Sequence, residues 1–320
     1  MLLLLPLTIV ARDGDTRHSL GFSVGGGGAL QVQKSELYTL KPRLGADAQA
    51  ELFYSLRHNR FVWEIGGAFD WDRTQQRIGD FTNEIWCLDN DAIPENLYFR
   101  YHYTNMIETQ QMGWVGGQTR FGLHFTDQLY GMVGVKIATP VFGSYRNTSD
   151  LMTDGFYPTD IDPHGNDASY AFYPEVKMAY GEELKLHPLL ISPTLELGGE
   201  FLLSASVSLR AALYGEYGFP LMLETNSLPL TIYTQKAVTD PCNQSLQELQ
   251  SAVKFSSLMG FNDGSGLWQR ARFGLKLTLL IHPSTPEHCN CLNETPLRRR
   301  KGGTLILQNN YHVRRQNDDF

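Results

Sequence analysis

A sustained alternation of apolar and polar residues is the feature that most restricts how this chain folds. Residues 267–281 read LWQRARFGLKLTLLI, where every second residue from Leu267 is apolar with one exception, and the residues between them include Arg270, Arg272 and Lys276. Successive side chains of a β-strand point to opposite faces of its sheet. The stretch therefore predicts a strand with one apolar face and one positively charged face.

Stretches of this kind recur along the chain, and the lengths of their connections follow a pattern. Tight hairpins are predicted at 57–60, at 126–128 and at 204–205, whereas the connections 31–45, 73–113, 142–190 and 220–266 are long. Strict alternation of short and long connections is typical of outer-membrane barrels and rare in compact soluble domains. We expect an all-β protein, an antiparallel transmembrane β-barrel with long extracellular loops and eight strands, at 18–30, 46–56, 61–72, 114–125, 129–141, 191–203, 206–219 and 267–281.

Two further segments leave the number of strands open. LYFRYHYTN (97–105) and SYAFYPEVKMAY (169–180) would give a barrel of ten strands and a wider lumen if both crossed the membrane. With eight strands, the side chains of the barrel fill its interior.

In such a barrel the apolar faces meet lipid and the charged faces line the lumen. Both signs of charge are present, so the inward residues can pair, which predicts a plugged lumen. A soluble lipocalin-like barrel would reverse the two faces; the long connections at one end and the scarcity of lysine on the polar faces argue against it. The expected lumen charge network is Glu51, Glu64, Asp70, Asp72, Arg120, Lys136, Glu196, Glu200, Arg210, Glu216, Arg270 and Arg272.

The two ends of the chain differ from the rest in composition. Residues 1–11 form an apolar segment that we interpret as the remnant of a signal peptide, which implies export. Residues 18–283 form the barrel, and residues 284–320 are expected to be a disordered or truncated periplasmic tail. The net charge of -7 argues against a nucleic-acid partner. The sequence has no run of 18 apolar residues, so it predicts no transmembrane helix.

Motifs that carry chemistry are weak in this sequence. The glycines at 25–28 lack the lysine of a phosphate loop and predict a close approach of strands. Residues 160–167 have part of a calcium-loop pattern, but Ala171 stands where the loop needs glutamate. Cys87 and Cys242 fall in predicted extracellular loops, where an exported protein could join them by a disulfide. We expect no catalytic residue, no enzyme activity, no metal and no cofactor.

Several stretches resemble a known family. HSLGFSVGGGGAL, YTNMIETQQ, LYGMVGVKIATPVFGSYRN, LELGGEFLLSASVSLRAALYGEYGF and RFGLKLTLLIHP with its Cys-x-Cys tail resemble outer-membrane β-barrel proteins of Bacteroidetes, in particular the barrel half of OmpA-like proteins, over roughly residues 18–292. The resemblance implies the outer membrane of a Gram-negative bacterium, with periplasmic termini. Many relatives continue into a peptidoglycan-binding domain; only 37 residues follow Pro283 here, so peptidoglycan binding is not expected.

The expected function is structural. We expect a monomeric barrel that contacts outer-membrane lipid and lipopolysaccharide, anchors in the envelope and presents surface loops. Two alternatives stay open: a narrow porin-like channel, and an adhesion or ligand-binding module that acts through the extracellular loops.

Overall fold

The computed structural model describes residues 16–89, 95–157, 171–184, 189–204, 206–220, 229–239, 241, 244–259, 268–283, 303–305 and 315–317. The chain divides into two units, Met1–His282 and Pro283–Phe320, which we treat separately. No helix formed by the described residues has both the length and the apolar composition needed to cross a membrane. In the second unit, β13 (Gly303–Leu305) pairs with β14 (Arg315–Asn317) in the tail that the sequence predicts to be disordered or truncated.

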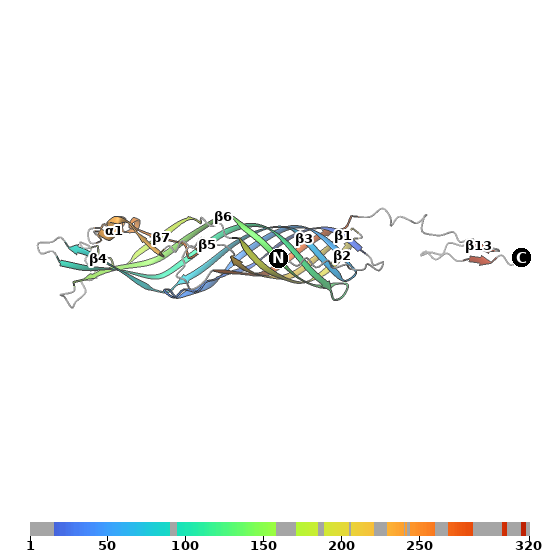
Figure 1. Cartoon of the computed structure of the whole chain (residues 1–320), viewed down its shortest axis with the longest axis horizontal. Coiled ribbons are helices and arrows are strands. Elements are labelled where there is room, and N and C mark those ends of the chain that lie inside the picture. The colour runs from blue at the N-terminus through green and yellow to red at the C-terminus, as the bar shows by residue number, and fades with distance from the viewer. Residues whose placement is uncertain are drawn as a thin grey trace, which may run out of the picture. The chain divides into compact units, whose positions relative to one another are not determined.

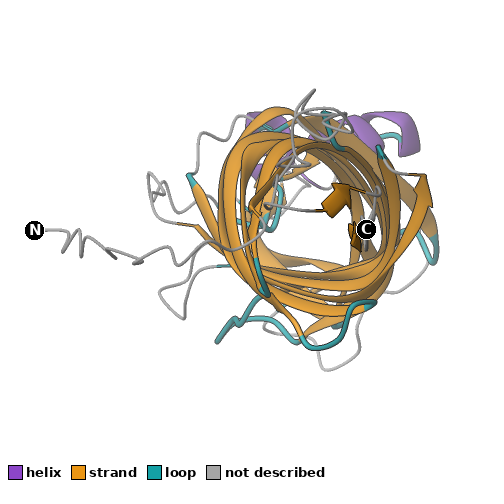
Figure 2. Cartoon of the chain, turned by 90° about the vertical axis from the view of Figure 1, so that its right-hand side faces the viewer, coloured by secondary structure: helices purple, strands orange, loops and turns teal. Residues whose placement is uncertain are grey.

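Eight antiparallel strands form a closed ring in the first unit (Figure 2). Each strand is hydrogen-bonded to the next, and the last returns to the first through the pairing of β12 with β1. All eight strands expected from the sequence are present, most of them longer than predicted. They are β1 (Thr16–Val32), β2 (Leu40–His58), β3 (Phe61–Ile78), β5 (Glu95–His124), β6 (Leu129–Phe156), β8 (Leu190–Ser204), β9 (Val207–Pro220) and β12 (Gln269–Ile281).

The stagger of the ring fixes the inclination of its strands. A row of directly paired residues that starts at Ser19 on β1 passes once around the ring and returns to β1 at Ala29, ten residues further along. With eight strands about 4.8 Å apart and a rise of about 3.3 Å per residue, this stagger corresponds to strands inclined roughly 40° to the ring axis.

The two ends of the ring differ. At the hairpin end, strands are joined by the short turns at 59–60 and 125–128, and β9 begins at Val207 soon after β8 ends at Ser204. At the other end, which we call the extended end, β5 and β6 continue beyond the ring, flanked by β4 (Phe81–Asp89) and β7 (Val176–Glu183) (Figure 1). The predicted long connections 73–113 and 142–190 are therefore wrong over much of their described length, because the strands simply continue.

The ten-strand alternative is also wrong. Residues 97–105 belong to β5, which already crosses the ring. Of the described residues of the second segment, 171–180, only Val176–Tyr180 lies in a strand, and β7 pairs with the part of β6 beyond the ring. The alternation that suggested membrane strands has another cause, since the apolar face here turns inward onto a second core.

Residues 229–259 cover this inward face. They form β10 (Thr231–Tyr233), α1 (Gln235–Thr239), α2 (Leu246–Ala252) and β11 (Val253–Phe255). A capping box between Ser245 and Glu248 starts α2, and β10 pairs with β11. We call the described residues of this segment, 229–239, 241 and 244–259, the cover. The core between the cover and the strands of the extended end consists of Ile78, Leu97, Phe99, Tyr101, Tyr103, Met106, Leu151, Ala171, Phe172, Val176, Met178, Leu230, Leu249, Val253, Phe255 and Leu258.

Within the ring itself the usual distribution of residues is inverted. The outward positions carry large exposed apolar side chains on every strand, while the alternate, inward positions carry buried polar and charged ones. This follows from the period-two pattern of the sequence, since a one-residue shift in any strand would exchange the two faces. The exposed residues include Phe22, Leu52, Ile65, Phe121, Val133, Leu195, Leu213 and Leu275, one from each strand.

Candidate functional site

The structure places all twelve residues of the predicted charge network inside the ring. Eleven of them are buried, and the side chain of Glu200 is 11% exposed near the hairpin end. Each residue occupies an inward position of its strand. Glycines make room between the long side chains: Gly274 lies between Arg272 and Lys276, and a Cβ at Gly27, opposite Gly274, would be 2.1 Å from the carbonyl oxygen of Phe273. The predicted close approach of strands at 25–28 is confirmed at this position.

The first cluster of the network surrounds Arg272. Its guanidinium lies 2.9 Å from Asp47, 3.0 Å from Asp70 and 3.2 Å from Glu216. Lys136 bridges two of these acids, at 3.1 Å from Asp70 and 2.8 Å from Glu216. One cation thus holds three carboxylates that come from three strands of the ring.

Arg270 extends this cluster toward the extended end. Its guanidinium lies 2.9 Å from Asp72 and stacks over the ring of Trp114, 4.9 Å from the ring centroid. The indole Nε1–H of Trp114 donates to Asp72 at 3.1 Å. Trp114 and Trp268 then pack with Met112 and Met259 in an apolar layer, where the network of ion pairs ends.

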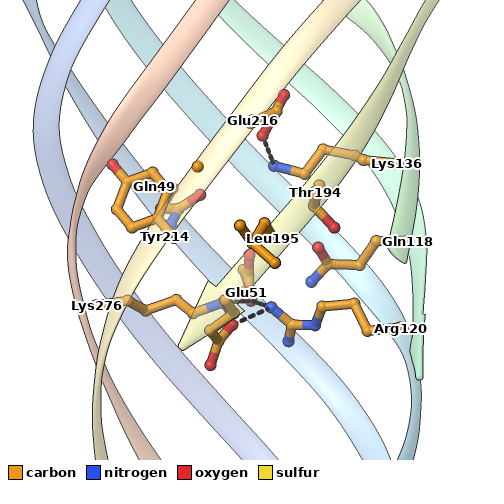
Figure 3. Close-up of a pocket in the computed structure, with 12 residues that line it drawn as sticks. Gln49, Glu51, Gln118, Arg120, Lys136, Thr194, Leu195, Tyr214, Glu216 and Lys276 are labelled. Atoms are coloured by element: carbon orange, nitrogen blue, oxygen red, sulfur yellow. Dashed lines mark hydrogen bonds and ion pairs between the residues drawn. The ribbon is translucent and has the colours of Figure 1, made fainter. Parts of the chain in front are cut away.

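The second cluster surrounds Arg120. Its guanidinium lies 2.9 Å from Glu51, 2.9 Å from Glu64 and 3.0 Å from Glu196. Lys276 pairs with Glu51 at 3.3 Å (Figure 3). It also pairs with Glu196. The hydroxyl of Tyr130 donates to Glu196 at 2.6 Å.

The third cluster lies at the hairpin end. Arg210 pairs with Glu64 and, at 2.7 Å, with Glu200. The imidazole of His282 lies between two hydroxyls, 2.6 Å from Ser19 and 3.0 Å from Ser208. These contacts link the mouth of the ring to the second cluster through Glu64.

Asp47 and Lys276 belong to the network although the predicted set omits them. Both occupy inward positions in the same alternation that identified the others, so the sequence contained the signal. With them the network has six cations and eight acids. Neutral donors offset part of the acidic excess, since Tyr214 donates to Asp47 and Ser23 to Glu51.

Little space remains between these side chains. The cavity in the middle of the ring has a volume of about 10 Å³ and is lined by residues of both central clusters, among them Glu51, Arg120, Lys136, Glu216 and Lys276 (Figure 3). A cavity of this size holds about one water molecule. In the middle of the ring, the described side chains therefore leave room for little more than one water molecule.

The extended end of the lumen is closed by the cover. The carboxylate of Glu108 accepts hydrogen bonds from the Leu258 amide at 2.9 Å and from the Ser257 hydroxyl at 2.8 Å. Gln33 donates to the Leu258 carbonyl at 2.9 Å. Burial raises the pKa of Glu108, while hydrogen bonds from Gln110, Leu258 and Ser257 act in the opposite direction.

The raised pKa predicts that the cover loosens as the pH rises. The folded state binds the Glu108 proton more tightly than the unfolded chain does, whose glutamate pKa is about 4.3. This contribution to stability is complete below that pH and is lost as the pH rises through the folded pKa. We expect hydrogen exchange of residues 253–259 to speed up from pH 4 to pH 7 more in the unmodified chain than in Glu108→Gln. Equal pH dependence in both proteins would contradict the prediction.

The described residues bear on one further kind of site, a metal centre. Among them, no group of three or more His, Cys, Asp or Glu side chains could hold a metal ion. Cys242, the side chain of Cys87 and residues 160–167 lie outside the described part, so the disulfide stays a prediction. No known protein family matches the chain, and no curated protein matches it.

Proposed function

We propose that this chain is an integral β-barrel of the outer membrane of a Gram-negative bacterium, with a structural, anchoring role. One observation carries the proposal: a closed ring of strands has an apolar outer surface and a charged interior. This apolar surface encircles the ring, whereas the largest apolar patch that a soluble monomer exposes to water is about 300–600 Å². In lipid, closure leaves no strand edge unpaired.

The height of the apolar surface supports the same function. On β12 every outward position from Ala271 to Ile281 is apolar, and Leu275 is 67% exposed. These positions span about 33 Å along the strand, or about 25 Å along the ring axis at an inclination of roughly 40°. The apolar band of an outer-membrane barrel is also about 25 Å tall. The extended end would then face the outside of the cell.

A filled lumen favours a structural barrel over a channel. The three clusters, the apolar layer at Trp114 and the cover at Glu108 occupy the path in sequence. Adhesion through surface segments stays a prediction, because residues 158–170, 221–228 and 260–267 lie outside the described part.

Planar bilayers offer the direct test of this function. We expect the refolded full chain to insert, to migrate differently on a gel before and after heating, and to give no steady conductance. Steady, ion-selective openings would contradict the filled lumen and favour the channel. Failure of the chain to insert into any bilayer would contradict the membrane location.

A further inference from the structure

Five exposed cations lie together on the outer surface of the ring, just beyond its apolar band. Lys41 stands directly opposite Arg77, and Arg43 is separated from Arg146 by Gln75 and Thr109 in one row of paired residues. Strand pairing thus collects charges that are distant in sequence onto one flank of the ring. We call this group the cationic patch: Lys41 and Arg43 on β2, Arg73 and Arg77 on β3, and Arg146 on β6.

The patch is not neutralised by the described part of the chain. None of its five residues forms an ion pair there; Arg77 donates to the amide oxygen of Asn105 at 3.1 Å. The acids around the patch are Asp150 and Asp80, which accept hydrogen bonds from Asn105 at 3.0 and 3.4 Å, and Glu183, which lies opposite Ser144 and so diagonal to Arg146. Like charges directly opposite each other, such as Lys41 and Arg77, destabilise a strand pair. An anion bound between them would remove this repulsion.

The position of the patch identifies the source of the anion. On β3, Trp71 is followed at the next outward position by Arg73, and on β6, Phe142 is followed by Ser144 and Arg146. On β3, Arg73 and Arg77 lie two and six residues beyond Trp71, which corresponds to about 5 Å and about 15 Å along the ring axis at an inclination of roughly 40°. On the opposite flank the outward residues at the upper edge, Leu189 and Phe219, are apolar.

We infer that the cationic patch binds the phosphate groups of an anionic glycolipid in the outer leaflet. Guanidinium groups form paired hydrogen bonds with phosphate oxygens, and four of the five residues are arginines. The acyl chains of such a lipid would lie on the apolar band directly below. The inference rests on the proposed function, because only a membrane-embedded ring places the patch at head-group level.

The test compares two variants that lose equal charge. R43Q/R73Q/R77Q removes three patch cations, and R17Q/R60Q/K254Q removes three exposed cations elsewhere. Each full chain is refolded in zwitterionic detergent and titrated with lipid A, with dephosphorylated lipid A or with inorganic phosphate, and native mass spectrometry counts the bound molecules. Each cation near an anionic lipid surface contributes enough that losing three should weaken lipid A binding roughly 100-fold.

The outcomes separate this inference from the proposed function. We expect the patch variant alone to lose lipid A binding and dephosphorylated lipid A to bind weakly to all proteins. Equal loss in both variants, equal binding of the dephosphorylated lipid, or equally tight binding of inorganic phosphate would overturn the inference while insertion into bilayers still supports the barrel. If the triple variant does not fold, R43Q/R73Q and R77Q/R146Q apply the same test, each with an expected loss of roughly 30-fold.

Discussion

Arg272→Met is expected to destabilise the folded ring by about 3–5 kcal/mol. The Arg272 side chain is fully buried and contacts Asp47, Asp70 and Glu216 within 3.2 Å. Methionine fills a similar volume but leaves these carboxylates in the interior with fewer counter-charges. Breaking a buried ion pair from one side costs more than the pair contributes, because the remaining charge is not solvated.

Urea titration of the refolded chain, followed by gel migration, measures this effect. Arg60→Met is the matched control, since Arg60 is exposed and makes no ion pair with the described residues; we expect it to change stability by no more than about 0.5 kcal/mol. Arg272→Met/Asp47→Asn should recover part of the loss, because it removes one uncompensated acid. A loss below about 1 kcal/mol for Arg272→Met would mean that water or other cations compensate the acids.

The alternation of residues was sufficient to predict the ring and the contents of its lumen. A strand has only two faces, so the phase of Arg270 and Arg272 against Phe273 and Leu275 decides which residues point inward. Asp47 was omitted from the predicted network although it alternates in phase with Gln49 and Glu51. The set of inward residues was therefore fully present in the sequence.

Which inward residues pair was not predictable from the sequence. Arg272 reaches Asp47 on a strand 225 positions earlier in the chain, and Arg210 reaches Glu64 over 146 positions. These contacts depend on the order of strands around the ring and on its ten-residue stagger between Ser19 and Ala29. Both are properties of closure, and no local pattern encodes them.

The strand segments beyond the ring were not predicted, because the inward face of β5 changes from polar to apolar along the strand. The irregular pairing between Thr104 and Ile107 shifts the phase of β5 by one residue. Beyond this point, toward the extended end, the inward residues are apolar, such as Phe99 and Tyr101, whereas the charged residues Glu108 and Arg120 point inward on its other side. The core that Phe99 and Tyr101 enter is completed by the cover, whose helices of five and seven residues are too short to give a clear periodic signal.

Leu275→Arg distinguishes a lipid-facing surface from a water-facing one by the size of its effect. Leu275 is 67% exposed and lies near the middle of the apolar band on β12. In a bilayer, arginine at the midplane of a barrel's outer face costs about 2–4 kcal/mol. In water, the same replacement of an exposed leucine changes stability by no more than about 0.5 kcal/mol. The expected result is a loss of about 2–4 kcal/mol in lipid vesicles, measured by urea titration.

The control for this substitution is Leu37→Arg, since Leu37 is 68% exposed and lies in the connection between β1 and β2, outside the band. We expect no more than about 0.5 kcal/mol from this change. Equal and small effects at both positions would contradict a lipid-facing band, and would leave the charged interior without its membrane explanation. A large effect at Leu275 alone would tie the inverted distribution of residues to the bilayer, because only in hydrocarbon does an exposed leucine become a costly place for charge.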